Sequence, residues 1–501
     1  MSEKIHRGKI KMPPDPLVVK YLIQPGIDND VKYRYQAFLD CNKAHVLMLA
    51  KQGIIKQAVA AAILRSNDKM AAMGDKPDFP IDPGREDFYF NIEAHLIEDV
   101  GIEIGGQQHT ARSRNDLYAT CARLAVRNAY FKLCHVYNKM RQAIIDVARK
   151  NEDAVFAGYT HMQPSEPITF AHYCSAILNA MQRDFRRISL VFEGLNICPL
   201  GGGSMGSTTW DIDRNYTAHL LGFDAPVDNS IDCVASRDFV TDLLSSLSIA
   251  ANTISRFCQD LYVWASPDFG YVEVSDSCAV CSSIMPQKKN PWVLEHIKAK
   301  AAHVEGCYMS ALNVMKNVIY SHCEDMCGES ANYLYPGIEE FTEMCELTEV
   351  SIAGITVKKD YMIEKARGNF CTVTELANYL VRHDAISFRM AHDIVAGVVD
   401  YMIKHNKKAD EIGLDIVNPI FESLFGRKTS MTEEEIHAAL DPRKIAYAKK
   451  AIGGTAPEEV ERQLNNRQAG LDRDNSELEN RIAKVKSAKA ELEAAVKSMT
   501  A

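Results

Sequence analysis

The chain has 501 residues, of which 47% are hydrophobic and 25% are charged, and its formal net charge is −9. This composition is ordinary for a soluble globular protein, and the acidic balance gives no basic surface for nucleic acid or an anionic membrane. The N-terminal segment is charged and then proline-rich, without the apolar core of a signal peptide, and no stretch stays apolar for the roughly eighteen residues that a membrane-spanning helix needs. The 14 cysteines have no regular spacing, so we expect reduced thiols in a cytoplasmic protein.

Helical periodicity dominates the chain, and strand-like alternation is scarce and short. The chain is too long for one small core, so we expect several helical regions. We predict an all-α protein with an N-terminal helical domain at 1–110, a central domain of long helices at 111–365, a small C-terminal helical domain at 366–440 and an extension at 441–501.

Three long helical patterns lie in the central region. The first follows Asn115 and meets no proline or glycine before Gly158. The second begins near Asp238, with an apolar stripe from Leu243 to Leu261, and the third begins just past Pro291. Each is two to three times as long as an average helix of about eleven or twelve residues. Helices of this length bury their apolar stripes against one another in a bundle, often across subunits.

The extension carries a short heptad pattern. Its apolar residues from Leu471 to Met499 are spaced by seven, four and three residues, in a background rich in Ala, Lys and Glu. This pattern is typical of a helix that joins subunits in an oligomer, and equally of an amphipathic helix that packs on its own subunit. We assign it no chemistry.

Three polar clusters fall at the predicted ends of the long helices, where a bundle enzyme places its active site. They are the segments His109–Asp116, Gly158–Gln163 and Cys281–Pro291. Each cluster taken alone has a structural explanation: the first as a helix cap, the second as a buried histidine and the third as a turn with exposed lysines. Together they offer hydroxyls, fixed cations and amide donors beside a histidine, which favours a dicarboxylate ligand and a proton transfer.

The string SSIMPQKKNP in the third cluster resembles the signature loop of the aspartase/fumarase superfamily. HTARSRND and GYTHMQ resemble the two other signature regions of its argininosuccinate lyase branch, and the resemblance covers about residues 20–465. It implies an all-α fold in which long central helices form a homotetrameric bundle, with each active site shared by three subunits. It also implies reversible anti-elimination of fumarate from an N-substituted aspartate, without a metal or an organic cofactor.

The resemblance further implies a role for each residue of the site. Ser282 is the base once its hydroxyl is activated, and Lys288 supplies positive charge to Ser282 and to the developing dianion. His161 donates a proton to the departing nitrogen, directly or through water, and Glu295 orients His161. The carboxylates of the substrate are bound by a set of polar side chains: Ser113, Arg114, Asn115, Thr160 and Asn290.

The part of the family motif that binds the arginine half is not kept. Where these lyases carry Tyr, Gln and Lys after the third signature, this chain has His322, Cys327 and Ser330, and Trp292 replaces the usual Asp after Asn-Pro. A pocket that loses hydrogen-bond partners binds its old ligand less tightly by about 1 kcal/mol or more for each partner. We therefore expect an amine half other than arginine, an aminopolycarboxylate or a diamine, with His322 in its pocket; argininosuccinate itself is the alternative.

Two other patterns carry no predicted function. Cys278 and Cys281 form a CxxC pair, but a structural zinc ion needs four ligands, so we predict no metal site. Gly201–Gly203 lacks the GK[ST] of a phosphate-binding loop, so we interpret it as a tight loop between helices.

The protein could instead have a structural, non-catalytic function, because a lyase of this branch has been recruited as an eye-lens crystallin. Loss of Ser282, His161 or Lys288 would indicate such a role. All three residues are present, which favours an enzyme.

Overall fold

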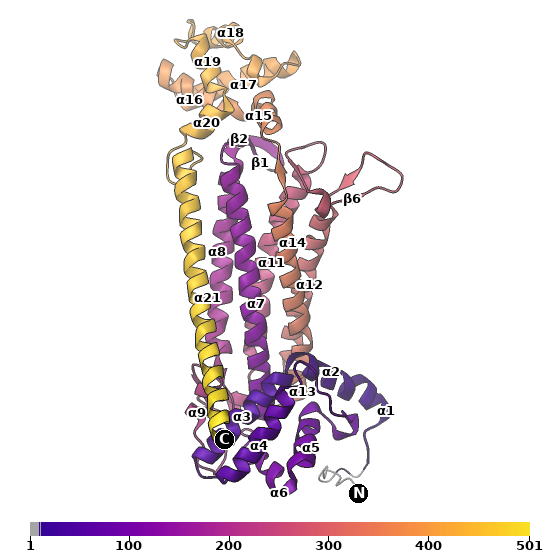
Figure 1. Ribbon diagram of the computed structural model, residues 1–501. Helices are drawn as coiled ribbons and strands as arrows, with labels where there is room; N and C mark the ends of the chain where they lie inside the picture. Colours follow the sequence, from indigo (N-terminus) through magenta and orange to yellow (C-terminus); the bar gives the residue numbers. More distant parts are fainter. Residues whose placement is uncertain (1–9, 11) are drawn as a thin grey trace.

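The chain folds into a long helical bundle with groups of shorter helices at both ends (Figure 1). This computed structural model describes residues 10 and 12–501, and most of the charged N-terminal segment lies outside the described residues. Helices predominate and the strands are few and short, which confirms the expected all-α class. No helix in the described part of the chain is both long and apolar enough to cross a membrane.

Five long helices pack side by side along the centre of the molecule: α7 (Arg114–Lys150), α8 (Phe170–Leu195), α11 (Asp238–Trp264), α12 (Trp292–Met315) and α14 (Leu334–Ala353). The three long helices predicted from the sequence are confirmed as α7, α11 and α12. The apolar stripe predicted along α11, from Leu243 to Leu261, is fully buried in the main hydrophobic core. Each large apolar side chain buried in this way contributes about 1.5–3 kcal/mol.

A group of short helices surrounds the end of the bundle where α7 begins (Figure 1). From the N-terminal part of the chain come α1 (Pro16–Val18), the π-helix η1 (Val19–Ile23), α2 (Gln24–Tyr33), α3 (Tyr35–Lys51), α4 (Gln57–Ala71), η2 (Pro83–Arg85), α5 (Phe88–Val100), α6 (Ile102–Gly105) and η3 (Gly106–His109). Later parts of the chain add α9 (Arg214–Leu220), α10 (Ser230–Ala235), α13 (Glu324–Cys327) and η5 (Glu329–Tyr333). A second hydrophobic core lies here and draws residues from all along the chain, including Leu200, Phe223 and Leu492.

The opposite end of the bundle carries most of the strands and a second group of helices. The strands pair as β1 (Val155–Thr160) with β2 (Gln163–Thr169), β3 (Ile197–Cys198) with β4 (Ala225–Pro226), β5 (Val272–Glu273) with β8 (Thr356–Val357), and β6 (Val280–Cys281) with β7 (Lys289–Asn290). In the described part of the chain the β3–β4 pair is parallel and the other three pairs are antiparallel; β3 and β4 lie at the end of the bundle where α7 begins. The helices are η4 (Asp276–Cys278), α15 (Lys359–Gly368), η6 (Phe370–Thr372), α16 (Val373–Asp384), α17 (Phe388–Lys404), η7 (Ala409–Glu411), α18 (Leu414–Phe425), α19 (Glu433–Ala439) and α20 (Pro442–Ala448). A third hydrophobic core holds α16 to α19 together.

The last helix, α21 (Pro457–Thr500), runs back along the whole bundle (Figure 1). It packs on α7, α8, α4, α3 and α9 of its own chain, with the heptad residues Leu471, Leu478 and Leu492 buried. An ion pair of 2.7 Å joins Arg141 to Asp474. The heptad pattern was compatible with packing between subunits or on the same subunit, and in the structure α21 packs on its own subunit.

Candidate active site

The first predicted cluster opens α7, and local hydrogen bonds explain why the helix begins there. The Asn115 amide donates to Ser113 Oγ at 3.2 Å, and the Ser113 amide donates to Asp116 Oδ1 at 3.0 Å, so Ser113 and Asp116 form a capping box. Asp116 Oδ2 accepts from the amides of Gly201 and Gly203 at 2.8 and 2.9 Å. The glycine segment is therefore a tight loop, as predicted, and it anchors the N-terminus of α7.

Arg114 lies beside two carboxylates at this helix end. Its NH1 is 2.6 Å from Asp87 Oδ2 and 3.6 Å from Glu86 Oε2, and its guanidinium stacks 4.2 Å from the centre of the Phe90 ring. Burial raises the pKa of Asp87 above its ordinary value, although Arg114 opposes that shift. Asn115 donates from Nδ2 to the Ser204 carbonyl at 3.2 Å, so both side chains have fixed positions.

A cavity of about 510 Å³ opens at this end, where α2, α7 and α13 meet. It is lined by Arg114 and Asn115, and by His322 and Cys327 from the segment that departs from the family motif. The structure thus brings His322 into one cavity with two of the predicted carboxylate-binding residues. Ser330 does not line the cavity: it is buried, and its hydroxyl donates to the Met326 carbonyl at 2.6 Å.

The electrostatics of this cavity keep His322 neutral. Burial lowers the pKa of the His322 imidazole, and the positive charges of Arg237 and Arg114 lower it further. His322 Nδ1 lies 3.2 Å from Cys327 Sγ, and burial raises the pKa of that thiol. The pair is therefore an uncharged imidazole and an uncharged thiol.

Arg237 lines the same cavity, although sequence reasoning assigned it no role. It lies in the string NSIDCVASRDFV, directly before the apolar helix α11, and a charged residue at such a boundary is the signal that could have found it. Asp87 was missed in the same way: it caps α5 by accepting from the Phe90 amide at 2.8 Å, and it also pairs with Arg114.

The second and third clusters lie at the opposite end of the bundle. Thr160 and His161 form the exposed tip of the β1–β2 hairpin, where His161 has a positive φ of 54°. Ser282 and Lys288 belong to the loop between β6 and β7, which projects from the bundle (Figure 1). A hydrogen bond of 2.8 Å between the hydroxyls of Tyr159 and Tyr271 joins the hairpin to the segment that leads to this loop.

Ser282 is held by hydrogen bonds within its own loop. Its Oγ accepts from the amides of Met285 at 3.1 Å and Ile284 at 3.4 Å. Asn290 is the last residue of β7, and Glu295 is exposed in the first turn of α12. Trp292 is the first residue of α12 and lies far from the cavity that contains Arg114 and His322. Among residues 10 and 12–501, no hydrogen bond or ion pair joins the side chains of Ser282, Lys288, His161 and Glu295 to one another.

The predicted residues therefore form two groups at opposite ends of one chain. Helix α7 alone has 37 residues, which corresponds to about 55 Å. Four predicted substrate-binding residues occupy one end: Ser113, Arg114, Asn115 and His322. The other end holds the catalytic candidates His161, Ser282, Lys288 and Glu295, together with the predicted substrate-binding residues Thr160 and Asn290.

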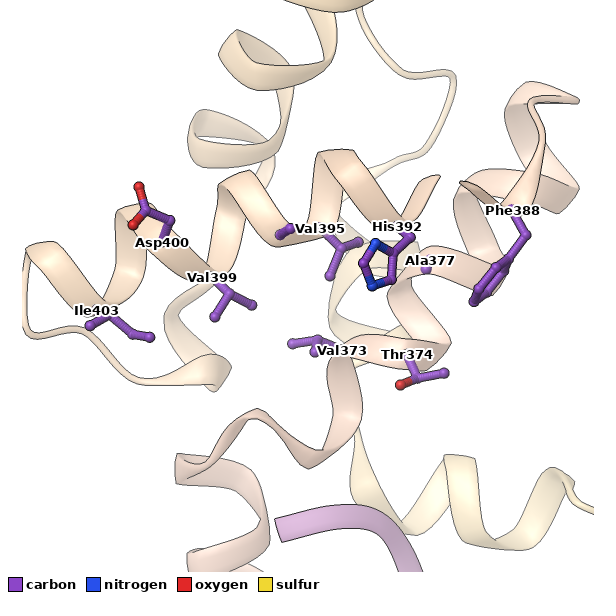
Figure 2. A pocket seen from close by; sticks show the side chains of 10 residues that line it. Val373, Thr374, Ala377, Phe388, His392, Val395, Val399, Asp400 and Ile403 are labelled. Carbon is purple, nitrogen blue, oxygen red and sulfur yellow. The ribbon is translucent and has the colours of Figure 1, made fainter. Parts of the chain in front are cut away.

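A second cavity, of about 410 Å³, lies between α16 and α17 (Figure 2). Phe388, Val395 and Val399 give it an apolar wall, with His392 and Asp400 beside them. None of the predicted site residues lines it.

Within the described residues there is no group of three or more His, Cys, Asp or Glu side chains that could hold a metal ion. All 14 cysteines are free thiols, and of the CxxC pair Cys278 is buried whereas Cys281 is exposed.

Comparisons with known proteins agree with this architecture. A family model described as lyase matches residues 29–306, and one described as argininosuccinate lyase C-terminal matches residues 370–446. Argininosuccinate lyase 1 of Shouchella clausii is 43% identical over 471 residues, which cover 94% of each chain. The argininosuccinate lyase of Methanocaldococcus jannaschii is 34% identical, and the match covers 97% of this chain and 98% of that protein. The latter match continues beyond residue 465 into the heptad segment.

Among solved structures, an EDDS lyase in complex with formate has a TM-score of 0.86 and 27% identity, and the match covers 98% of this chain and 97% of that one. A variant of EDDS lyase with bound fumarate matches equally well. The similarity to these lyases spans both ends of the bundle and both groups of predicted residues.

Proposed function

Because the chain belongs to the argininosuccinate lyase branch of the aspartase/fumarase superfamily and is a carbon–nitrogen lyase, we propose that it releases fumarate from an N-substituted aspartate. The observation that carries the proposal is the cavity in which Arg114 and Asn115 lie together with His322. A guanidinium and an amide at a helix N-terminus bind a carboxylate, and the uncharged side chains beyond them leave room for an amine half. The presence of Ser282, His161 and Lys288 supports catalysis over the non-catalytic alternative.

Ser282 is the proposed base, and its surroundings support that role. The two backbone amides that donate to its Oγ stabilise negative charge on that oxygen, and Lys288 lies six residues along the same loop. The base removes a proton beside one carboxylate, the extra charge develops on that carboxylate, and the carbon–nitrogen bond then breaks. His161, oriented by Glu295, is the proposed proton donor to the leaving nitrogen.

We propose that the active site is completed in a cytoplasmic homotetramer by residues of three subunits. Within one chain, Arg114 and Ser282 lie at opposite ends of the bundle, so a neighbouring chain of opposite direction must supply the loop. Exposed apolar side chains along the bundle, Ile249 of α11 and Met309 and Leu312 of α12, provide surface for such packing.

The names of the relatives support argininosuccinate as the substrate. A second candidate, an N-substituted aspartate with an amine other than arginine, is favoured by one observation. His322 and Cys327 line the cavity in place of the family's Tyr and Gln, and Ser330 turns away from it in place of Lys. The similarity to EDDS lyase fits this second candidate.

The test is fumarate release by the purified full-length protein, followed by the ultraviolet absorbance of fumarate. With argininosuccinate, turnover on the order of 1–10³ s⁻¹ assigns the first candidate and rejects the second. Ser282→Ala lowers the rate by about 10²- to 10⁴-fold, whereas the neighbouring Ser283→Ala serves as the matched control and leaves it nearly unchanged. If neither argininosuccinate nor a panel of amines with fumarate reacts, the proposed function is wrong.

A further inference from the structure

One buried guanidinium lines the active-site cavity without a carboxylate partner. Arg237 is only 3% exposed. Its NH1 donates to the carbonyls of Ser236 at 2.6 Å and Val234 at 3.5 Å, at the C-terminal end of α10. Its NH2 contacts only Cys327 Sγ, at 3.5 Å, and its Nε has no acceptor among residues 10 and 12–501. A buried charge without a counter-ion is unfavourable, which points to a ligand that supplies one.

The edge of Arg237 that lacks an oxygen acceptor is formed by Nε and NH2. These two groups lie side by side on a guanidinium, and together they can donate two parallel hydrogen bonds to one carboxylate. The other guanidinium groups of the cavity already have carboxylate partners: Arg114 pairs with Asp87, and Arg34 pairs with Asp30 at 3.1 Å.

In the described part of the chain no carboxylate lies at ion-pair distance from Arg237; Glu324, which lines the cavity, and Asp238 act on its charge only from farther away. Cys327 touches its NH2 but stays a thiol, because burial raises its pKa. His322 is held neutral by burial and by the charge of Arg237 itself. The positive charge is therefore available to an anion that enters the cavity.

A purely structural role for Arg237 is the simpler explanation, and Arg127 shows what that role looks like. Arg127 is also buried, and its Nε also has no partner, but its NH1 and NH2 both donate to oxygens. The acceptors are Asn196 Oδ1 at 2.8 Å and the carbonyls of Leu221 and Gly222 at 2.8 and 3.1 Å. Arg127 does not line the cavity, whereas Arg237 does and leaves its NH2 without an oxygen.

We propose that the Nε/NH2 edge of Arg237, beside Cys327, binds a carboxylate on the amine half of the substrate. Arg237 is then the residue that makes the enzyme select amines that carry a carboxylate, such as amino acids and aminopolycarboxylates, over plain diamines. This inference rests on the proposed function, because it assigns the cavity to the amine that leaves when fumarate forms.

The experiment runs the reaction in the addition direction, with fumarate and matched pairs of amines that differ only in a carboxylate. Suitable pairs are arginine and agmatine, ornithine and putrescine, and 2,3-diaminopropionate and ethylenediamine. For the pair that reacts, the wild type is expected to favour the carboxylate-bearing member in kcat/KM by about 10²-fold or more. Arg237→Gln is expected to bring both members to similar values and to leave the KM for fumarate unchanged.

Two further variants separate binding from stability. Arg127→Gln removes a buried guanidinium that caps carbonyls outside the cavity, so it lowers the melting temperature but leaves the preference unchanged. Cys327→Asp gives Arg237 an internal carboxylate, so it slows the reaction of the carboxylate-bearing amine and spares the plain amine. This second variant tests the proposal even if Arg237→Gln does not fold.

The outcomes for the inference and for the proposed function are distinct. If the wild type adds fumarate to agmatine or putrescine as readily as to the parent amino acid, the role of Arg237 is overturned while the lyase activity stands. A preference that survives Arg237→Gln overturns it as well. If no amine reacts and argininosuccinate gives no fumarate, the proposed function itself fails.

Discussion

Acid is expected to destabilise the protein through His109, the first residue of the cluster that opens α7. Burial, together with the charges of Arg112 and Arg114, lowers the pKa of His109 from 6.5 to about 4. The unfolded chain therefore takes up this proton near pH 6.5, and the folded chain only near pH 4. Stability is lost as the pH falls through this window, by roughly 2 kcal/mol at pH 5 and roughly 3 kcal/mol at pH 4.

The assay compares urea unfolding of the wild type and His109→Asn at pH 7.5 and pH 5. Asparagine places an amide near the position of Nδ1, which lies 2.8 Å from the Tyr89 hydroxyl, so that contact is kept. We expect the variant to lose roughly 2 kcal/mol less than the wild type between the two pH values. His219→Gln, an exposed histidine 2.7 Å from Glu491, is the control and should follow the wild type. Equal losses in wild type and His109→Asn would refute the reasoning.

Two further predictions concern the loop beside α7 and the last helix. Gly203→Ala should lower the free energy of unfolding by about 1–3 kcal/mol, because φ is +65° and the added Cβ would lie 2.6 Å from the Ser207 carbonyl oxygen. Gly306→Ala, in an open position within α12, is the control and should be neutral or stabilising. Equal effects of the two substitutions on thermal unfolding would contradict this account. Lys43→Met should weaken the packing of α21 on its own chain, because the buried Lys43 ammonium lies 3.3 Å from Glu493. The measurement is the rate of proteolysis within α21, which should rise. An unchanged rate would argue against a stabilising role for this ion pair.

The long helices could be predicted because their signals are local. The apolar residues of α11 recur at helical spacing, and all of the predicted stripe from Leu243 to Leu261 is buried. The start of α7 was predicted within two residues because the apolar periodicity begins directly after Asn115; in the structure Ser113 and Asp116 form the capping box that opens the helix. Such patterns depend on residues that are neighbours in sequence.

The packing of α21 could not be predicted in the same way. A heptad stripe shows that one face of a helix is buried, but it does not identify the surface that covers it. That surface is given by contacts between distant parts of the chain, such as Lys43 with Glu493 and Arg141 with Asp474. Loop closure over hundreds of residues leaves no local mark in the sequence.

The sequence by itself determined the family and the residue types of the site, because the signature motifs are short, contiguous strings. Only the tertiary structure decided that Arg114, His322 and Arg237 line one cavity, and that Ser282 lies at the far end of the same bundle. The physical reason is that packing of the helices along their buried stripes sets the positions of their ends. Residues more than 100 positions apart can therefore meet, while residues of one proposed site can lie a whole helix length apart within a single chain.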